Sequence, residues 1–70
     1  MNTGAIQRMF GTEVRRIRTQ RGLSQEKLAF EAGLHRTYIS QVEGGNRNIS
    51  LINIYRLAAA LGVKAKELLH

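Results

Sequence analysis

The chain has 70 residues without cysteine or proline, and its 11 Lys and Arg against 5 Asp and Glu give a formal net charge of +6. This length is enough for one small domain, the lack of cysteine excludes disulfides and thiolate metal sites, and no apolar run is long enough to span a membrane. We therefore expect a cytoplasmic protein forming a single domain over residues 1–70, with the polyanionic partner that such a basic charge favours.

The first predicted element is a long helix. Residues 1–5 show no pattern, and we expect them to be disordered. A helix is predicted from Ile6 to Gln20 or Arg21, because apolar residues recur at helical spacing until glycine 22 interrupts them. Its apolar face contains Ile6, Phe10, Val14 and Ile17.

A short helix is predicted next, after Ser24, which can cap it by accepting a hydrogen bond from an amide of the first turn. Its buried face is marked by Leu28, Ala29 and Ala32. Gly33 then provides a residue that can adopt the left-handed conformation at a helix end. Phe30 points away from this face, and we expect it to pack against the first helix.

A second short helix follows the glycine with no room for more than a sharp turn. Leu34, Ile39 and Val42 are predicted to face the core. The outer face then carries Arg36, Thr37, Ser40 and Gln41. Two short helices in this register, at about residues 24–43, are typical of a helix-turn-helix whose second helix enters the major groove of DNA.

The remaining chain is predicted to add a loop and two more helices. The loop starts at Gly44-Gly45, Ser50 caps a helix from Leu51 to about Leu61, and Gly62 ends it. A last short helix is expected from Ala65 to Leu69, which makes five helices and an all-α fold. The core stripe of the fourth helix is predicted to contain Leu51, Ile54, Leu57, Ala58 and Leu61.

The fourth helix also carries a second apolar row. A helix that is apolar nearly all round has to be covered on both sides, and a 70-residue domain cannot form two cores. We therefore expect residues 51–69 to form a homodimer interface, unless the last helix of the same chain covers the row. The predicted interface residues are Ile52, Tyr55, Ala59, Val63 and Leu68.

Three strings carry a resemblance to a known family: Leu28-Ala29-Phe30, then the run from Ala32 to Ser40, and Asn46-Arg47-Asn48. From about Gly11 to Leu69 the chain resembles the lambda-repressor-like (Cro/C1, XRE-type) DNA-binding family. Within that family it is most similar to the controller proteins of restriction–modification systems. The resemblance implies a compact five-helix domain. It also implies an ion pair between Arg18 and Glu43; the alternative is that these are two exposed charges without a contact.

Site residues are expected on and around the second helix of the motif. Arg36, Thr37 and Gln41 are predicted to read bases, since arginine can donate two hydrogen bonds to guanine. Contacts to the DNA backbone are predicted for Gln25, His35, Tyr38, Ser40, Asn46, Arg47 and Asn48. The resemblance places the loop residues there, while Gln25 lies at a helix N-terminus, which attracts phosphate. Each assignment has an alternative. The loop could be merely solvated, Gln25 could be solvated or only cap its helix, and Arg36 could form a surface salt bridge.

The predicted function is sequence-specific regulation of transcription by a homodimer on double-stranded DNA, at a roughly palindromic operator near the nucleoid. The resemblance implies a controller that activates and represses its own restriction–modification operon, with RNA polymerase as a further candidate partner. The alternative is a phage-type repressor or an antitoxin of the same fold. A remote alternative is a protein-interaction module that has lost DNA binding. No catalytic arrangement, metal-ligand spacing or cofactor motif is visible, so an enzyme is not expected.

Overall fold

The computed structural model describes residues 2–69, and its regular elements are helical. These are α1 (Thr3–Gln20), α2 (Gln25–Ala32), α3 (Arg36–Glu43), α4 (Leu51–Leu61) and one 3₁₀ turn, η1 (Ala65–Glu67). No strand occurs within the described residues. The all-α class is confirmed. The predicted fifth α-helix is wrong, because the amides of Glu67 and Leu68 bond to carbonyls only three residues back.

α1 begins earlier than the sequence predicted. The side-chain oxygen of Asn2 accepts a hydrogen bond from the Ala5 amide at 3.2 Å, which caps the helix so that it starts at Thr3 instead of Ile6. Residues 3–5, expected to be disordered, are therefore helical. Residue 1 lies outside the described part of the chain.

The ends of α2 and α4 follow the predicted local signals. Ser24 accepts from the Lys27 amide at 2.9 Å, and Ser50 accepts from the Asn53 amide at 3.2 Å. Gly33 and Gly62 end these helices with φ of 70° and 72°, the left-handed region that a side chain disfavours. Each short helix is therefore bounded by its own residues.

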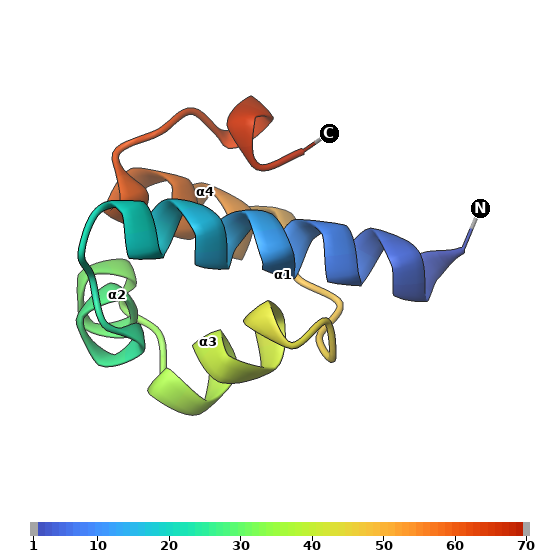
Figure 1. Ribbon diagram of the computed structural model, residues 1–70, viewed down its shortest axis with the longest axis horizontal. Helices are drawn as coiled ribbons and strands as arrows, with labels where there is room; N and C mark the ends of the chain where they lie inside the picture. Colours follow the sequence, from blue (N-terminus) through green and yellow to red (C-terminus); the bar gives the residue numbers. More distant parts are fainter. Residues whose placement is uncertain (1, 70) are drawn as a thin grey trace.

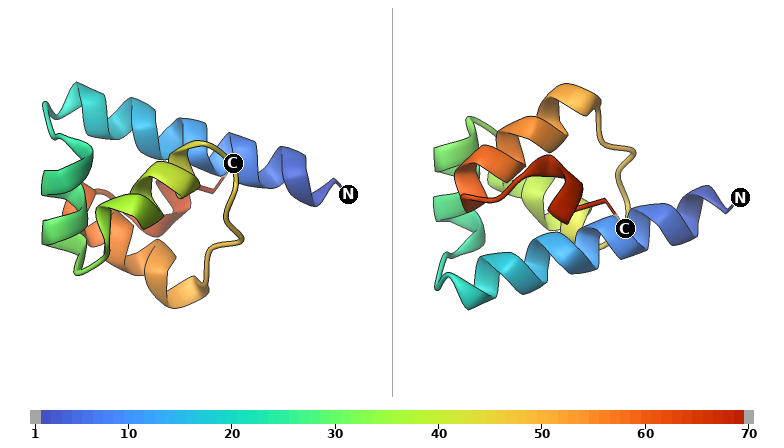
Figure 2. Two further views of the ribbon diagram at one scale, coloured as in Figure 1. Left: turned by 90° about the horizontal axis from the view of Figure 1, so that it is seen from below. Right: turned by 90° about the horizontal axis from the view of Figure 1, so that it is seen from above.

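The helices enclose one core, and α1 runs along the length of the molecule on one side of it (Figures 1 and 2). α3 packs against α1 and α2 on one side, and the C-terminal turn covers α1 and α4 on the opposite side (Figures 1 and 2). The core side chains are Phe10, Val14, Ile17, Leu28, Ala29, Ala32, Ile39, Val42, Leu57, Ala58, Leu61 and Leu68. α3 thus lies on the surface with a firm support behind it.

Buried Gly11 marks a close approach of α1 to the end of α3. A methyl group added there would lie 2.1 Å from the Val42 carbonyl oxygen and 2.9 Å from that of Glu43. The crossing therefore requires a residue without a side chain at this position.

Three apolar residues do not lie where the sequence predicted. Leu51 is 67% exposed at the start of α4, and does not belong to the core. Phe30 is 79% exposed and lies beneath the Lys27 ammonium, 5.6 Å from its ring centroid, instead of packing on α1. Leu68 is buried against the core by the C-terminal turn, so its assignment to a partner interface is wrong.

Candidate nucleic-acid interface

α3 presents a polar row to solvent while its apolar side chains hold it in place. Ile39 and Val42 are buried, as their i, i+3 spacing predicts. The exposed side chains on the outer face are Arg36, Thr37, Ser40 and Gln41. Because buried side chains hold this helix against the core, the four polar groups keep fixed positions relative to one another and can act as one surface.

The N-terminus of α3 is open. His35 occupies the N-cap position, but its side chain makes no capping hydrogen bond. The first-turn amides of α3 therefore lack the side-chain acceptor that Ser24 gives α2 and Ser50 gives α4. Free amides at the positive end of a helix dipole favour an anion.

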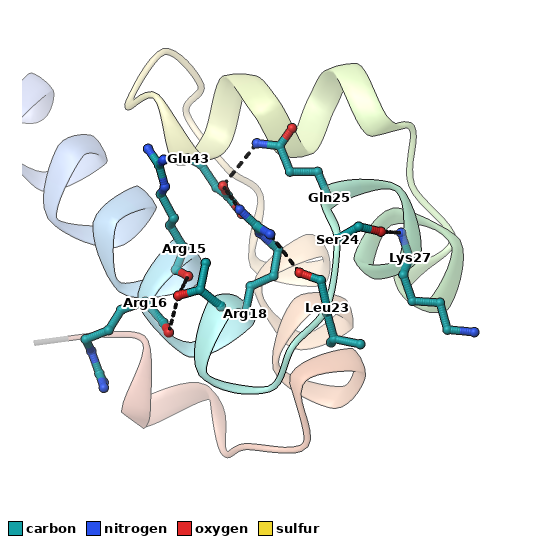
Figure 3. Close-up of polar contacts among 9 residues, drawn as sticks. Arg15, Arg16, Arg18, Leu23, Ser24, Gln25, Lys27 and Glu43 are labelled. Atoms are coloured by element: carbon teal, nitrogen blue, oxygen red, sulfur yellow. Dashed lines mark hydrogen bonds and ion pairs between the residues drawn. The ribbon is translucent and has the colours of Figure 1, made fainter.

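The carboxyl end of α3 is fastened by an ion pair that lies largely out of solvent (Figure 3). The Arg18 guanidinium donates to both Glu43 carboxylate oxygens, from Nε at 2.6 Å and from Nη2 at 3.0 Å. Its Nη1 donates to the Leu23 carbonyl oxygen at 2.7 Å. The two side chains are only 11% and 3% exposed, so the expected pair is present and joins α1 to α3.

Gln25 joins the same cluster. Its Nε2 donates to Glu43 Oε1 at 3.1 Å, so the side chain is neither capping α2 nor freely solvated (Figure 3). A primary amide has two N–H donors, and this bond uses one of them. The second N–H is left for an acceptor, which is the arrangement a phosphate contact needs.

A second cluster links α3 to the following loop and to α4. The Nε of Arg47 donates to Gln41 Oε1 at 2.9 Å, and the Arg47 guanidinium lies 5.0 Å from the Tyr38 ring centroid. The Tyr38 hydroxyl accepts from Asn53 Nδ2 at 3.1 Å. Arg47, Gln41 and Tyr38 were each predicted at the interface from the sequence, whereas Asn53 was not. The contacts span up to 15 residues, for which the sequence carries no local signal.

The other predicted backbone contacts lie on α3 and in the loop that follows it. Ser40 lies on α3, and Asn46 and Asn48 are exposed in the loop, whose course is fixed by a bond from the Asn46 amide to the Gln41 carbonyl. Nothing brings these three side chains into one cluster. Ser40 belongs to the polar row of α3, and the two asparagines are exposed in the loop that follows it.

The second apolar row of α4 remains on the surface. Ile52 and Tyr55 are 67% and 60% exposed, and Leu51 and Ala59 lie exposed beside them. The alternative that the C-terminal turn covers this row is wrong, because that turn packs elsewhere on the core. Val63 is only half-buried, so it can still contribute at the edge.

Metal binding and membrane spanning find no support within residues 2–69. No group of three or more metal-ligating side chains lies together, and no helix in this range is long and apolar enough to cross a membrane.

Comparison with known proteins places this geometry among regulators. A family model described as helix-turn-helix matches residues 14–68. Control protein C.BamHI from Bacillus amyloliquefaciens is 56% identical over 68 residues, which cover 96% of this chain and 84% of that protein. Control protein C.SmaI from Serratia marcescens is 44% identical over 91% of this chain and 76% of that protein. The crystal structure of the restriction–modification controller protein C.AhdI from Aeromonas hydrophila matches with a TM-score of 0.90 and 52% identity, over 91% of this chain and 97% of that one.

Proposed function

This chain belongs to the helix-turn-helix family, with restriction–modification control proteins among its relatives, and from that membership we propose that it is a sequence-specific, DNA-binding regulator of transcription. It binds a roughly palindromic operator as a homodimer, with one recognition helix in each of two major grooves about one helical turn apart. The observation that carries the proposal is the exposed row on α3, which has no acidic side chain and stands on a buried support.

The polar groups divide into base readers and backbone clamps. Arg36, Thr37 and Gln41 read base edges, because they are exposed on the outer face of α3. The second N–H of Gln25 and the open amides behind His35 bind phosphates and set the register of the helix on the duplex. The residues assigned to this second group are Gln25, His35, Tyr38, Ser40, Asn46 and Asn48, and the sequence alone would add Arg47.

The homodimer forms through the exposed apolar row of α4. Ile52, Tyr55 and Ala59 form its centre, Val63 lies at its edge, and Leu51 extends it beyond the residues that the sequence singled out. Large exposed apolar side chains that lie together favour a protein partner. A second copy is the partner that a two-fold symmetric operator requires.

The regulated genes are inferred from the relatives. Three of them are named control or controller proteins, and one of these as a restriction–modification controller. We infer that this chain controls a restriction–modification operon that contains its own gene, activating at low occupancy and repressing at high occupancy. Activation implies that the bound protein contacts RNA polymerase. Both proteins would then meet on the DNA of the nucleoid, in the cytoplasm.

Selection from random duplexes followed by measured affinities tests the proposal. The wild type should enrich one roughly palindromic sequence. Arg36→Ala should weaken binding to that duplex about tenfold or more and relax one base pair in each half-site, since a bidentate arginine–guanine contact gives discrimination of this order. Arg21→Ala, which removes the same charge from an exposed site at the end of α1, should affect selected and random duplexes equally. Enrichment of no sequence would contradict the proposal.

A further inference from the structure

The side-chain amide of Gln41 is held in one orientation by Arg47. The Nε–H of Arg47 donates to Oε1 of Gln41 across the loop that follows α3, over 2.9 Å. An arginine side chain carries only donors, so the amide atom that faces it has to be the oxygen. The two N–H groups on Gln41 Nε2 are therefore directed away from Arg47, and the exposed side chain offers donors.

Arg47 is itself positioned by contacts on its other side. Its guanidinium lies over the Tyr38 ring, a cation–π arrangement at 5.0 Å, and the hydroxyl of that half-buried ring accepts a hydrogen bond from Asn53 of α4. Tyr38 is thus fixed both by its place on α3 and by α4. Arg47 is a loop residue, but its guanidinium rests on a ring that has little freedom to move.

We propose that Arg47 determines the base preference of Gln41, so that Gln41 selects guanine over adenine. This inference rests on the proposed DNA-binding function. It gives Arg47 a different role from a phosphate clamp, which would strengthen binding to every sequence alike. Arg47 is here a positioning residue that acts through Gln41.

The donor pattern of the bases explains the preference. Guanine shows two acceptors, N7 and O6, in the major groove, whereas adenine shows the acceptor N7 and the amino donor N6. A free glutamine pairs with adenine by using Nε2 and Oε1 together. In this protein the amino group of adenine would approach an oxygen that already faces a guanidinium cation. Guanine instead accepts from Nε2, and the same cation favours its electronegative edge.

The test starts from the duplex that the wild type selects out of a random pool. The base pair beneath Gln41 is the one whose preference is lost in Gln41→Ala, and binding is then measured to all four bases at that pair. The wild type should prefer guanine over adenine by about tenfold. Arg47→Lys keeps the charge but not the planar fork of donors, so the preference should fall to about threefold or less, or turn to adenine, with an unchanged salt dependence.

Two further variants test whether Arg47 acts by positioning Gln41 or in some other way. In the Gln41→Ala background, Arg47→Lys should change the preference at that pair by less than about twofold, because the effect passes through Gln41. Arg21→Lys, the same change at an exposed arginine remote from Gln41 in the sequence, should leave the preference intact.

Several results would overturn the inference while DNA binding stands. These are no altered position in Gln41→Ala, an adenine preference in the wild type, or a full Arg47→Lys effect without Gln41. An equal loss of affinity for all four bases in Arg47→Lys would overturn it too, because that is the behaviour of a clamp. If the wild type selects no sequence at all, the proposed function fails and this inference with it.

Discussion

Among single residues, Glu43 joins α3 to two other helices. Its carboxylate is almost fully buried and accepts hydrogen bonds from Arg18 of α1 and Gln25 of α2. The pair with Arg18 could be predicted, because the resemblance aligns both positions. The bond from Gln25 could not, because an amide at a helix N-terminus is equally suited to phosphate, and its partner lies 18 residues away.

Glu43→Gln should therefore destabilise the protein strongly. Removing one charge of a buried pair leaves the other uncompensated, and we expect a loss of about 3 kcal/mol in the free energy of unfolding. For a domain of this size that lowers the melting temperature by more than about 10 °C. Urea and thermal unfolding followed by circular dichroism measure both quantities.

Glu31→Gln is the matched control for this prediction. Glu31 pairs with Lys27 over 3.3 Å on the surface of α2, where both side chains are about half exposed. Its loss should cost less than about 1 kcal/mol, since water screens such pairs. Equal effects of the two substitutions would mean that the Arg18–Glu43 pair carries no special weight in the fold.

At the scale of the helices, prediction succeeded where the signal is local. Ser24, Gly33, Ser50 and Gly62 each fix a helix end through contacts within five residues, and the structure places them as expected. The start of α1 was missed because Asn2, the residue that caps it, lies outside the apolar pattern. The C-terminal segment forms only a 3₁₀ turn, because Leu68 is drawn into the core over too few residues for a stable α-helix.

The crossing of α1 and α3 leads to a prediction about two glycines of one helix. Gly11→Ala should destabilise the protein by about 3 kcal/mol, because the new methyl group meets backbone oxygens of α3 that cannot move alone. Gly4→Ala places its methyl 3.3 Å from the end of the Arg8 side chain, which can rotate away, and 3.3 Å from the Asn2 cap oxygen, which can give slightly while keeping its bond to Ala5. It should stabilise α1 by up to about 1 kcal/mol, since alanine favours a helix.

Urea unfolding of both glycine variants measures these two changes in the free energy of unfolding, which should have opposite signs. The substitution and the helix are the same, so helix propensity cannot account for a difference between them. A Gly11→Ala variant as stable as the wild type would show that α1 and α3 are not packed as closely as the structure has them. Operator affinity should fall with Gly11→Ala and stay unchanged with Gly4→Ala.

For the whole molecule, the sequence indicated that α4 has two apolar faces, but it could not assign every residue between them. Leu51 belongs to the predicted core stripe by spacing, yet it lies exposed beside Ile52 and Tyr55. Which face of such a helix points inward depends on its angle to the other helices, and that angle is set by packing far away in the sequence. Leu68 was misassigned because the turn after α4 folds it back onto the core.

Tyr55→Asp should convert the dimer into a monomer. A carboxylate at the centre of the apolar row would have to lose its hydration when two copies meet, without a partner to compensate for it. Sedimentation equilibrium at protein concentrations on the order of tens of micromolar should show dimers for the wild type and monomers for the variant. The melting temperature of the wild type should rise with protein concentration, and that of Tyr55→Asp should not. Phe30→Asp is the control, because it places the same charge at another exposed aromatic, on α2, and should leave the dimer intact. Dimers that persist in Tyr55→Asp would move the interface to another apolar surface, of which the exposed Ile6 and Met9 on α1 are the foremost candidates.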